Sequence, residues 1–269
     1  MKKEQIVVQL NPDVTPTGSD LGIVNAARKS FGRRSEWDYH HDIGLPPLKY
    51  LKPKDRRLLE FLARGMTAND FAEFLHKLDD NVNNGGDEDF QKTKELLWQW
   101  RNTPTHDTPF NHGFFSFEVK APIFVARHLV KHEYLIMSEY SRRYITDDVE
   151  FYSHDYREAT EDKKQGSGGS HENTKGWEHK INLSNKEALA CYNTMLKDGV
   201  APEQARGMLP QDLMTAWTWS GTLGAFANMC KLRLSKDTQV ETRYVAEKVY
   251  EELKEQFPVA APLLVEGVY

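Results

Sequence analysis

The sequence predicts a helix-rich α/β fold with a modest sheet. Residues 114–120 alternate between apolar and polar side chains, as a strand with one buried face does. Residues 55–66 and 239–256 instead repeat apolar side chains at intervals of three and four residues, which is typical of a helix with one buried face. Segments of the second kind are more numerous along the chain, so we expect helices to outnumber strands.

In the first half of the chain, the helix at 55–66 has the clearest signals. Asp55 is its candidate N-cap, because an aspartate side chain can accept hydrogen bonds from the first backbone N–H groups of a helix. Gly65 interrupts the pattern, which then resumes. The other elements expected here are a strand at 6–10, a short helix at 21–30, a polar loop at 81–89 and a helix at 90–100.

In the second half, Pro122 marks the start of a helix that we expect to continue to about Met137. Proline suits the first helical turn, where its missing N–H costs nothing. The charged, Gly/Ser-rich residues 158–179 predict a mobile loop. Further helical segments are expected at 185–198, in a short turn from Pro202, at 222–234 and at 239–256.

Composition excludes several classes of protein. The 269 residues carry 35 Lys+Arg against 40 Asp+Glu, a net charge of −5, which argues against a protein that coats nucleic acid. With 39% hydrophobic and 28% charged residues, the chain fits a globular protein. The apolar run at 6–10 is too short for the core of a signal peptide, and no apolar segment of the sequence is long enough to span a membrane. We therefore expect a cytoplasmic protein without membrane or nucleic-acid partners.

Common catalytic motifs are absent from the sequence. Two cysteines, Cys191 and Cys230, are too few for a disulfide framework or a cysteine-based zinc site. His128 and His132 have the spacing of zinc ligands on a helix, but HExxH would need histidine where Ile136 stands, so no metal is expected. The motifs GxSxG, GxxxxGK[ST] and GxGxxG do not occur. The sequence therefore predicts neither a serine nucleophile nor a classical phosphate loop.

Cations instead gather in otherwise apolar segments. Residues 122–130 are nearly all apolar apart from Arg127 and His128, and more cations follow up to residue 143. One alternative is a single solvated helix face. If the segment is buried, however, these cations need anionic partners, since unpaired buried charge is costly. Arg206 and Arg233 are further arginines in apolar segments, and the combination indicates a phosphate-bearing ligand.

Several of these segments resemble, in the same order, the flavin-dependent thymidylate synthases. That family's signature is Arg-His-Arg, seven residues and Ser, usually continuing to Arg-Tyr; here Lys-His-Glu at 131–133 is followed after seven residues by Ser141 and then by Arg143-Tyr144. The family segments AARVSY and HETPFEH resemble NAARKSF at 25–31 and HDTPFNH at 106–112. The remaining matches are at 115–127, 199–210, 232–233 and 239–241, so the resemblance covers about residues 20–260.

The resemblance implies a single α+β domain over residues 1–269 with a largely antiparallel sheet. It also implies a homotetramer whose active sites lie between subunits. FAD would be the cofactor, with methylene-tetrahydrofolate as carbon donor and NADPH as reductant in the reductive methylation of dUMP to dTMP. Reduced flavin supplies the hydride in this family and no protein nucleophile attacks the pyrimidine, which agrees with the missing nucleophile motifs.

The resemblance also implies roles for individual residues. Arg233 would be catalytic, because an arginine beside the uracil stabilises the ionised N3 atom. The residues implied to bind dUMP are His128, Lys131, Glu139, Tyr140, Ser141, Arg142, Arg143, Arg206 and Arg233. Those implied to bind FAD are His106, Thr108, Lys131, His132, Glu133, Glu139, Thr222, Leu223, Gly224 and Asn228.

Two departures from the family signature leave other functions open. Lys131 keeps a positive charge but lacks the planar guanidinium, and Glu133 reverses the sign of the second signature arginine. A carboxylate there would repel a flavin phosphate or the folate tail unless a cation pairs with it. One alternative is a variant enzyme that hydroxymethylates dUMP or acts on dCMP. Another is an inactive homologue that binds dUMP without flavin.

Overall fold

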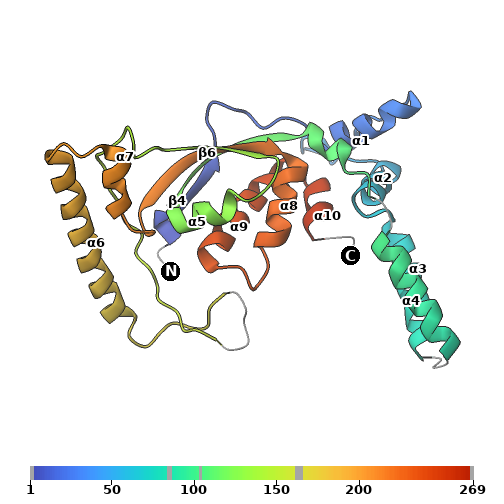
Figure 1. Ribbon diagram of the computed structural model, residues 1–269. Helices are drawn as coiled ribbons and strands as arrows, with labels where there is room; N and C mark the ends of the chain where they lie inside the picture. Colours follow the sequence, from blue (N-terminus) through green and yellow to red (C-terminus); the bar gives the residue numbers. More distant parts are fainter. Residues whose placement is uncertain (1–2, 84–86, 103–104, 161–165, 267–269) are drawn as a thin grey trace. The chain divides into compact units, whose positions relative to one another are not determined.

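The computed structural model describes residues 3–83, 87–102, 105–160 and 166–266 (Figure 1). It divides into two compact units, each assembled from three stretches of the chain. The first unit comprises Met1–Thr15, Phe115–Gly221 and Met229–Glu251, and the second comprises Pro16–Phe114, Thr222–Asn228 and Glu252–Tyr269. The expectation of a single domain stays a prediction.

A four-stranded sheet lies in the first unit, apart from its end residues Phe114 and Thr222, as the alternation at 114–120 predicts. Its order is β1 (Val7–Leu10), β4 (Phe114–Pro122), β6 (Met214–Thr222) and β5 (Leu135–Glu139). β1 pairs with β4, and β5 with β6, in antiparallel register. The prediction of a helix-rich fold with a small antiparallel sheet is therefore confirmed.

Strand β4 shows why its sequence alternates. Phe115, Phe117 and Val119 are buried on its apolar face. On the opposite face, polar side chains bond to β6: the Ser220 hydroxyl lies 2.8 Å from that of Ser116, and Thr218 donates to Glu118 at 2.7 Å. Each face of β4 thus makes its own kind of contact, one by packing and one by side-chain hydrogen bonds.

Helices make up most of the remaining structure. The first unit contains α5 (Ile123–Leu129), α6 (Thr174–Lys197), α7 (Pro202–Ala205) and the short 3-10 helices Lys3–Gln5 and Arg206–Met208. α8 (Leu223–Arg233) and α9 (Val240–Gln256) contribute residues to both units. The second unit contains α1 (Asp20–Arg28), α2 (Pro53–Arg64), α3 (Ala68–Asn83), α4 (Asp87–Asn102), α10 (Ala260–Val265), the 3-10 helices Lys29–Phe31 and Thr108–His112, and the hairpin of β2 (Asp38–His40) and β3 (Leu48–Tyr50).

The helices α3 and α4 form an excursion from the second unit. The backbone N–H of His106 donates to the Leu62 carbonyl at 2.9 Å, so the chain returns beside the point where it left α2. Within the excursion, the rings of Phe74 and Trp100 stack at 6.0 Å. The loop expected at 81–89 was too long, because α3 continues to Asn83 and α4 begins at Asp87; residues 84–86 lie outside the described part.

The predicted helix from Pro122 to Met137 was wrong in its second half. α5 ends at Leu129, Tyr134 takes a positive φ of 63°, and Met137 lies in β5 opposite Trp219 of β6. Hydrogen bonding to a distant strand decides this segment, and local periodicity cannot reveal such a partner.

Two further expectations need correction. Asp55 is not an N-cap, since Lys52 holds that position; Asp55 is instead buried, and accepts from Arg28 at 2.5 Å and from Ser35 at 2.8 Å. The loop expected at 158–179 is too long, because α6 begins at Thr174. Residues 161–165 of that loop lie outside the described part.

Among the described helices, none combines the length and apolar character that crossing a membrane requires.

Candidate functional site

Arg233, at the end of α8, joins two histidines of the first unit. Its Nε donates to Nε2 of His132 at 2.9 Å, and one terminal nitrogen donates to the backbone carbonyl of His128 at 3.1 Å. His132 lies in the turn between α5 and β5, so segments about a hundred residues apart in sequence meet here. The structure therefore brings together three of the residues that the sequence singled out.

The electrostatics of this cluster favour a neutral His132. Burial, followed by the positive charge of Arg233, lowers the pKa of His132 to about 4. At neutral pH its Nε2 therefore carries a lone pair that accepts from Arg233. Burial also lowers the pKa of Arg233 from its ordinary value. Of the five N–H donors of a guanidinium, the contacts to His132 and His128 use two and leave three for a ligand.

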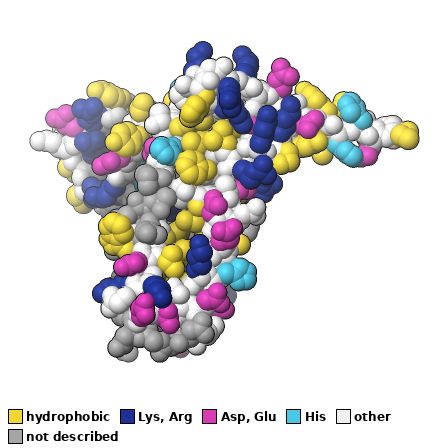
Figure 2. All heavy atoms as spheres, turned by 90° about the vertical axis from the view of Figure 1, so that its right-hand side faces the viewer, with side chains coloured by type: hydrophobic (Ala, Val, Ile, Leu, Met, Phe, Trp, Pro, Cys, Tyr) yellow, Lys and Arg dark blue, Asp and Glu magenta, His cyan; other side chains and the backbone are white. Residues whose placement is uncertain are grey.

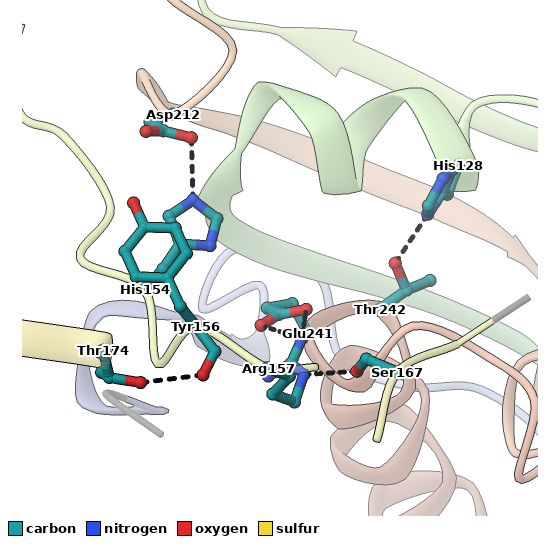
Figure 3. A network of polar contacts seen from close by, with 9 residues as sticks. All are labelled: His128, His154, Tyr156, Arg157, Ser167, Thr174, Asp212, Glu241 and Thr242. Carbon is teal, nitrogen blue, oxygen red and sulfur yellow. Dashed lines mark hydrogen bonds and ion pairs between the residues drawn. The ribbon is translucent and has the colours of Figure 1, made fainter. Parts of the chain in front are cut away.

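His128 is held in place from α9. Its Nδ1 lies 2.9 Å from the hydroxyl of the buried Thr242 (Figure 3). Burial and the charge of Arg233 lower the pKa of His128, while Glu241 acts in the opposite direction. The ring orientation is thus fixed by the first turn of α9.

Beside Thr242, the same turn carries a buried ion pair that sequence reasoning missed. Glu241 is fully buried, and both its oxygens accept from Arg157, at 2.8 and 2.9 Å (Figure 3). Nε of Arg157 donates to Ser167 at 2.6 Å. The block at 239–241 pointed to Glu241, but Arg157 stands in a charged stretch with no pattern that marks it as a partner.

Further polar contacts secure the segment around Arg157. His154 Nε2 lies 2.8 Å from Asp212, and the hydroxyl of Thr174 donates to the Tyr156 carbonyl at 2.9 Å (Figure 3). The described residues between His154 and Thr174 are thus attached at His154, at Arg157 and at the beginning of α6. Part of the predicted mobile loop is therefore anchored to the helix that positions His128.

The turn after β5 holds several of the residues expected to bind dUMP. Glu139 accepts from Thr215 at 2.9 Å, and the Tyr140 N–H donates to the Ala216 carbonyl at 2.8 Å. The buried guanidinium of Arg142 lies over the Tyr140 ring at 5.2 Å and donates to three backbone carbonyls of the same loop, those of Ile145, Asp147 and Asp148. Arg142 therefore shapes the loop from within.

Other cations in this unit are more accessible. Arg143 is exposed, and its Nε makes a long 3.4 Å contact to Ser141. Arg206 is exposed as well and donates to the Glu203 carbonyl at 3.3 Å. Lys131 and Glu133 are exposed and form no ion pair with the described residues, so no cation of this part of the chain neutralises Glu133.

In the second unit, a cavity of about 970 Å³ contains two of the residues expected to bind FAD. His106 and Thr108 both line it. The His106 ring stacks on Phe61 at 5.9 Å, and Leu58, Leu62 and Pro109 add apolar surface. The cavity thus offers a flat aromatic surface within an apolar wall.

The other residues expected to bind FAD in this unit cluster at the start of α8. The Thr222 hydroxyl accepts from the Ala225 N–H at 3.2 Å and bonds to Asn111 at 2.7 Å. A Cβ atom on Gly224 would lie 2.7 Å from the Asn111 side chain, so only glycine fits there without a shift. Leu223 is buried and Asn228 is exposed. Lys131, His132, Glu133 and Glu139, by contrast, belong to the first unit.

Metal ligands do not gather in the part of the chain that the structure describes. No group of three or more His, Cys, Asp or Glu side chains there could hold a metal ion.

Comparison with known proteins identifies the family. The family model described as thymidylate synthase complementing protein matches residues 48–259, well over half of the chain. The chain belongs to this family. The resemblance seen in the sequence is therefore confirmed at the level of the family.

Relatives in this family carry informative names. A flavin-dependent thymidylate synthase of Thermus thermophilus is 37% identical over 158 residues, which are 58% of this chain and 57% of that protein. One from Thermosipho africanus is 34% identical over 171 residues, or 62% of this chain and 75% of that protein. The chain thus spans less than two thirds of the length of the Thermus relative that it matches.

A solved structure supports the fold. The UMP/dUMP methylase PolB from Streptomyces cacaoi, bound with 5-Br dUMP, superposes with a TM-score of 0.67 at 24% identity, covering 95% of this chain and 93% of that one. At this level of sequence identity, the superposition demonstrates a shared fold but not a shared reaction.

Proposed function

We propose that this protein is a flavin-dependent thymidylate synthase that methylates dUMP to dTMP. FAD is the cofactor, methylene-tetrahydrofolate the carbon donor and NADPH the reductant. The observation that carries the proposal is the cluster of Arg233, His132 and His128, in which a fixed guanidinium keeps donors free for an anion. The names of the relatives from Thermus and Thermosipho support the same activity.

Arg233 acts by holding the pyrimidine, with no role as a nucleophile. Its remaining N–H groups stabilise the ionised N3 and the neighbouring oxygen of uracil, while neutral His132 and the His128 carbonyl fix the guanidinium. Arginine remains protonated, so it stabilises the anion electrostatically and does not serve as a base. Burial raises the pKa of the Cys230 thiol far above its ordinary value, which disfavours a thiolate there.

The phosphate of dUMP binds to the accessible cations of the first unit. Arg143 and Arg206 are exposed and make only weak contacts within the described chain, and the Ser141 hydroxyl lies beside Arg143. Arginine forks suit phosphate because they bind it with two parallel hydrogen bonds. Lys131, Glu139 and Tyr140 complete the nucleotide side, and Arg142 maintains the loop.

The residues present fit a flavin dinucleotide. The cavity of about 970 Å³ lies at the upper end of the usual size for ligand sites, and the stacked Phe61–His106 pair offers a surface for an aromatic ring. His106 and Thr108 would hold the cofactor together with Thr222, Leu223, Gly224 and Asn228. The resemblance to the family also implies FAD contacts for Lys131, His132, Glu133 and Glu139, which belong to the first unit. When bound and reduced, the flavin supplies hydride.

A second candidate function is a variant that hydroxymethylates dUMP or acts on dCMP. The observation that favours it is Glu133, which is exposed and has no cation partner among the described residues. A free carboxylate disfavours an anionic folate tail and changes how the carbon donor is held. The inactive homologue is less well supported, because the Arg233 cluster retains free donors.

We also infer that the active protein is a homotetramer with sites between subunits. Large apolar side chains close in sequence to His132 and Arg233 are exposed in the single chain: Tyr134 by 84%, Ile136 by 69% and Leu232 by 61%. Such side chains on neighbouring elements mark a surface that another protein covers.

The experiment begins with the absorption spectrum of the purified protein after loading with FAD and washing. Retained flavin bands are expected, and mass analysis should then find dTMP when dUMP, methylene-tetrahydrofolate and NADPH are supplied. A hydroxymethylated nucleotide, or a product from dCMP, would favour the variant enzyme. A colourless protein that binds dUMP and forms no product would support the inactive homologue.

Replacing Arg233 tests the mechanism. Arg233→Ala should lower turnover by a factor of about 10²–10³, the usual effect of removing a donor that stabilises an anion in the transition state. Arg127→Ala is the matched control, because Arg127 is an exposed cation on α5 with no assigned role. Thermal unfolding should be similar in both variants. An unchanged rate in Arg233→Ala would remove Arg233 from the mechanism.

A further inference from the structure

The cavity of the second unit is lined by cations that have no partner in the described chain. Arg33, Lys54 and Arg57 line it, are exposed, and make no ion pair or side-chain hydrogen bond with the described residues. We call these three residues the cation rim. A fourth cation of the lining, Arg28, is already neutralised by the buried Asp55 at 2.5 Å.

The charge of the lining is therefore unbalanced. Among the lining residues that the structure describes, Asp107 is the single carboxylate, against the three unpaired cations of the rim. About two positive charges are left without a counterion inside a concave surface, where walls of low dielectric focus the field. Figure 2 shows Lys and Arg side chains gathered beside hydrophobic ones on the face that it views.

Helix α2 arranges these groups in order along the cavity. Lys54, Arg57 and Phe61 recur at intervals of three and four residues, so they share one face of the helix. The cations lie near its N-terminus and the aromatic ring near its C-terminus. The N-cap residue Lys52 makes no side-chain capping hydrogen bond, so the positive end of α2 adds to the rim. A ligand with an anionic part and an aromatic part fits this order.

We propose that the cation rim binds the pyrophosphate of a dinucleotide, with a ring of that ligand against the Phe61–His106 pair. A dinucleotide pyrophosphate carries two negative charges, which matches the two unbalanced positive charges of the lining. A volume of about 970 Å³ also suits an elongated ligand better than a mononucleotide. The inference rests on the proposed function in that FAD is the expected dinucleotide, although NADPH carries the same pyrophosphate.

Adjacent arginines provide a matched control. Arg34 and Arg56 are exposed neighbours of Arg33 and Arg57 and do not line the cavity; Arg56 lies instead 3.6 Å from Glu60. The rim variant Arg33→Gln/Arg57→Gln and the control variant Arg34→Gln/Arg56→Gln therefore lose the same charge at positions one residue apart. Lys54→Gln can then be added to the rim variant.

The measurement is the affinity of the full-length protein for FAD, NADPH, riboflavin and methylene-tetrahydrofolate, followed by flavin fluorescence or calorimetry. The rim variant should bind FAD or NADPH about tenfold more weakly for each lost contact, because a hydrogen bond to a charged group contributes about this much to affinity. The control variant should stay within about threefold of the wild type. Riboflavin, which has the ring but no phosphate, should bind equally well to both variants. Whichever dinucleotide responds is the one that the rim holds.

Several outcomes would overturn the inference. If wild type binds FAD, and the rim variant binds both FAD and NADPH as tightly as wild type does, the rim is not a pyrophosphate site. The proposed flavin function would still stand. A loss confined to methylene-tetrahydrofolate would assign the rim to a carboxylate tail instead. If wild type takes up no FAD, the proposed function fails, and the binding of inorganic pyrophosphate then tests the inference separately. Pyrophosphate binding that is weakened in the rim variant but not in the control variant would sustain the inference. Wild type that binds no pyrophosphate would reject it.

Discussion

At the scale of single residues, neighbours in space decide which side chains are free to act. Arg142 and Arg143 are adjacent in sequence and equally plausible as phosphate ligands. Arg142 is buried and donates hydrogen bonds to three backbone carbonyls of its own loop, whereas Arg143 is exposed. The contact between Arg233 and His132 crosses about a hundred residues of sequence, so no local pattern predicts it. Resemblance to a family identified both residues but not their hydrogen bond.

His132 provides the prediction at this scale. Its ring should titrate with a midpoint of about 4, as followed by NMR of the histidine ring protons between pH 3 and 8. Arg233→Gln should raise this midpoint toward the ordinary histidine value, since one of the two causes of the low pKa is removed. Arg127→Gln, which removes an exposed cation on α5, should leave it unchanged.

The sign of the effect on stability follows from the same pKa. The folded-state pKa lies below the unfolded value of about 6.5, so the unfolded chain binds more protons between those two limits. The contribution of His132 to stability is therefore complete above about pH 6.5 and declines as the pH falls toward 4. A His132 midpoint near 6.5 in the wild type would contradict the buried, neutral acceptor.

At the scale of elements, sequence patterns predicted the strand β4 and most helices but not the pairing between them. The apolar and polar faces of β4 are visible in its sequence because both contacts are made by alternating side chains. β5 is different: its residues continue the apolar character of α5, and only pairing with β6 makes them a strand. Asp55 has the sequence signals of an N-cap, yet its buried carboxylate pairs with Arg28 of another helix.

The ion pair between Arg157 and Glu241 gives the prediction for elements. Glu241→Gln should lower the free energy of unfolding by about 3–5 kcal/mol, because it leaves the guanidinium of Arg157 without its buried counterion. Glu247→Gln is the matched control on the same helix. Glu247 forms an exposed pair with Arg243 at 3.8 Å, so its loss should cost less than about 1 kcal/mol. Urea unfolding followed by circular dichroism measures both values.

Equal, small losses in the two α9 variants would mean that the buried pair does not hold the segment. Proteolysis supplies a second readout. Residues 166–170 should be cut faster in Glu241→Gln than in Glu247→Gln, because Arg157 also bonds to Ser167. Unchanged cleavage would limit the role of the pair to the core of the first unit.

At the scale of the whole molecule, the residues expected to bind FAD fall into two groups. His106, Thr108 and the start of α8 belong to the second unit, and the Lys131–Glu133 turn belongs to the first. The sequence contained both groups, but its linear order did not reveal that three separate stretches build each unit.

The oligomeric state supplies the last prediction. Native mass spectrometry and light scattering at micromolar concentration should give the mass of four chains. Ile136→Lys should shift the population toward smaller species, since Ile136 is 69% exposed in the single chain and a charge there opposes burial against another subunit. Leu45→Lys is the control, because Leu45 is similarly exposed, by 66%, but belongs to the second unit. A wild-type monomer that still converts dUMP would refute sites between subunits, because each chain would then form its active site alone.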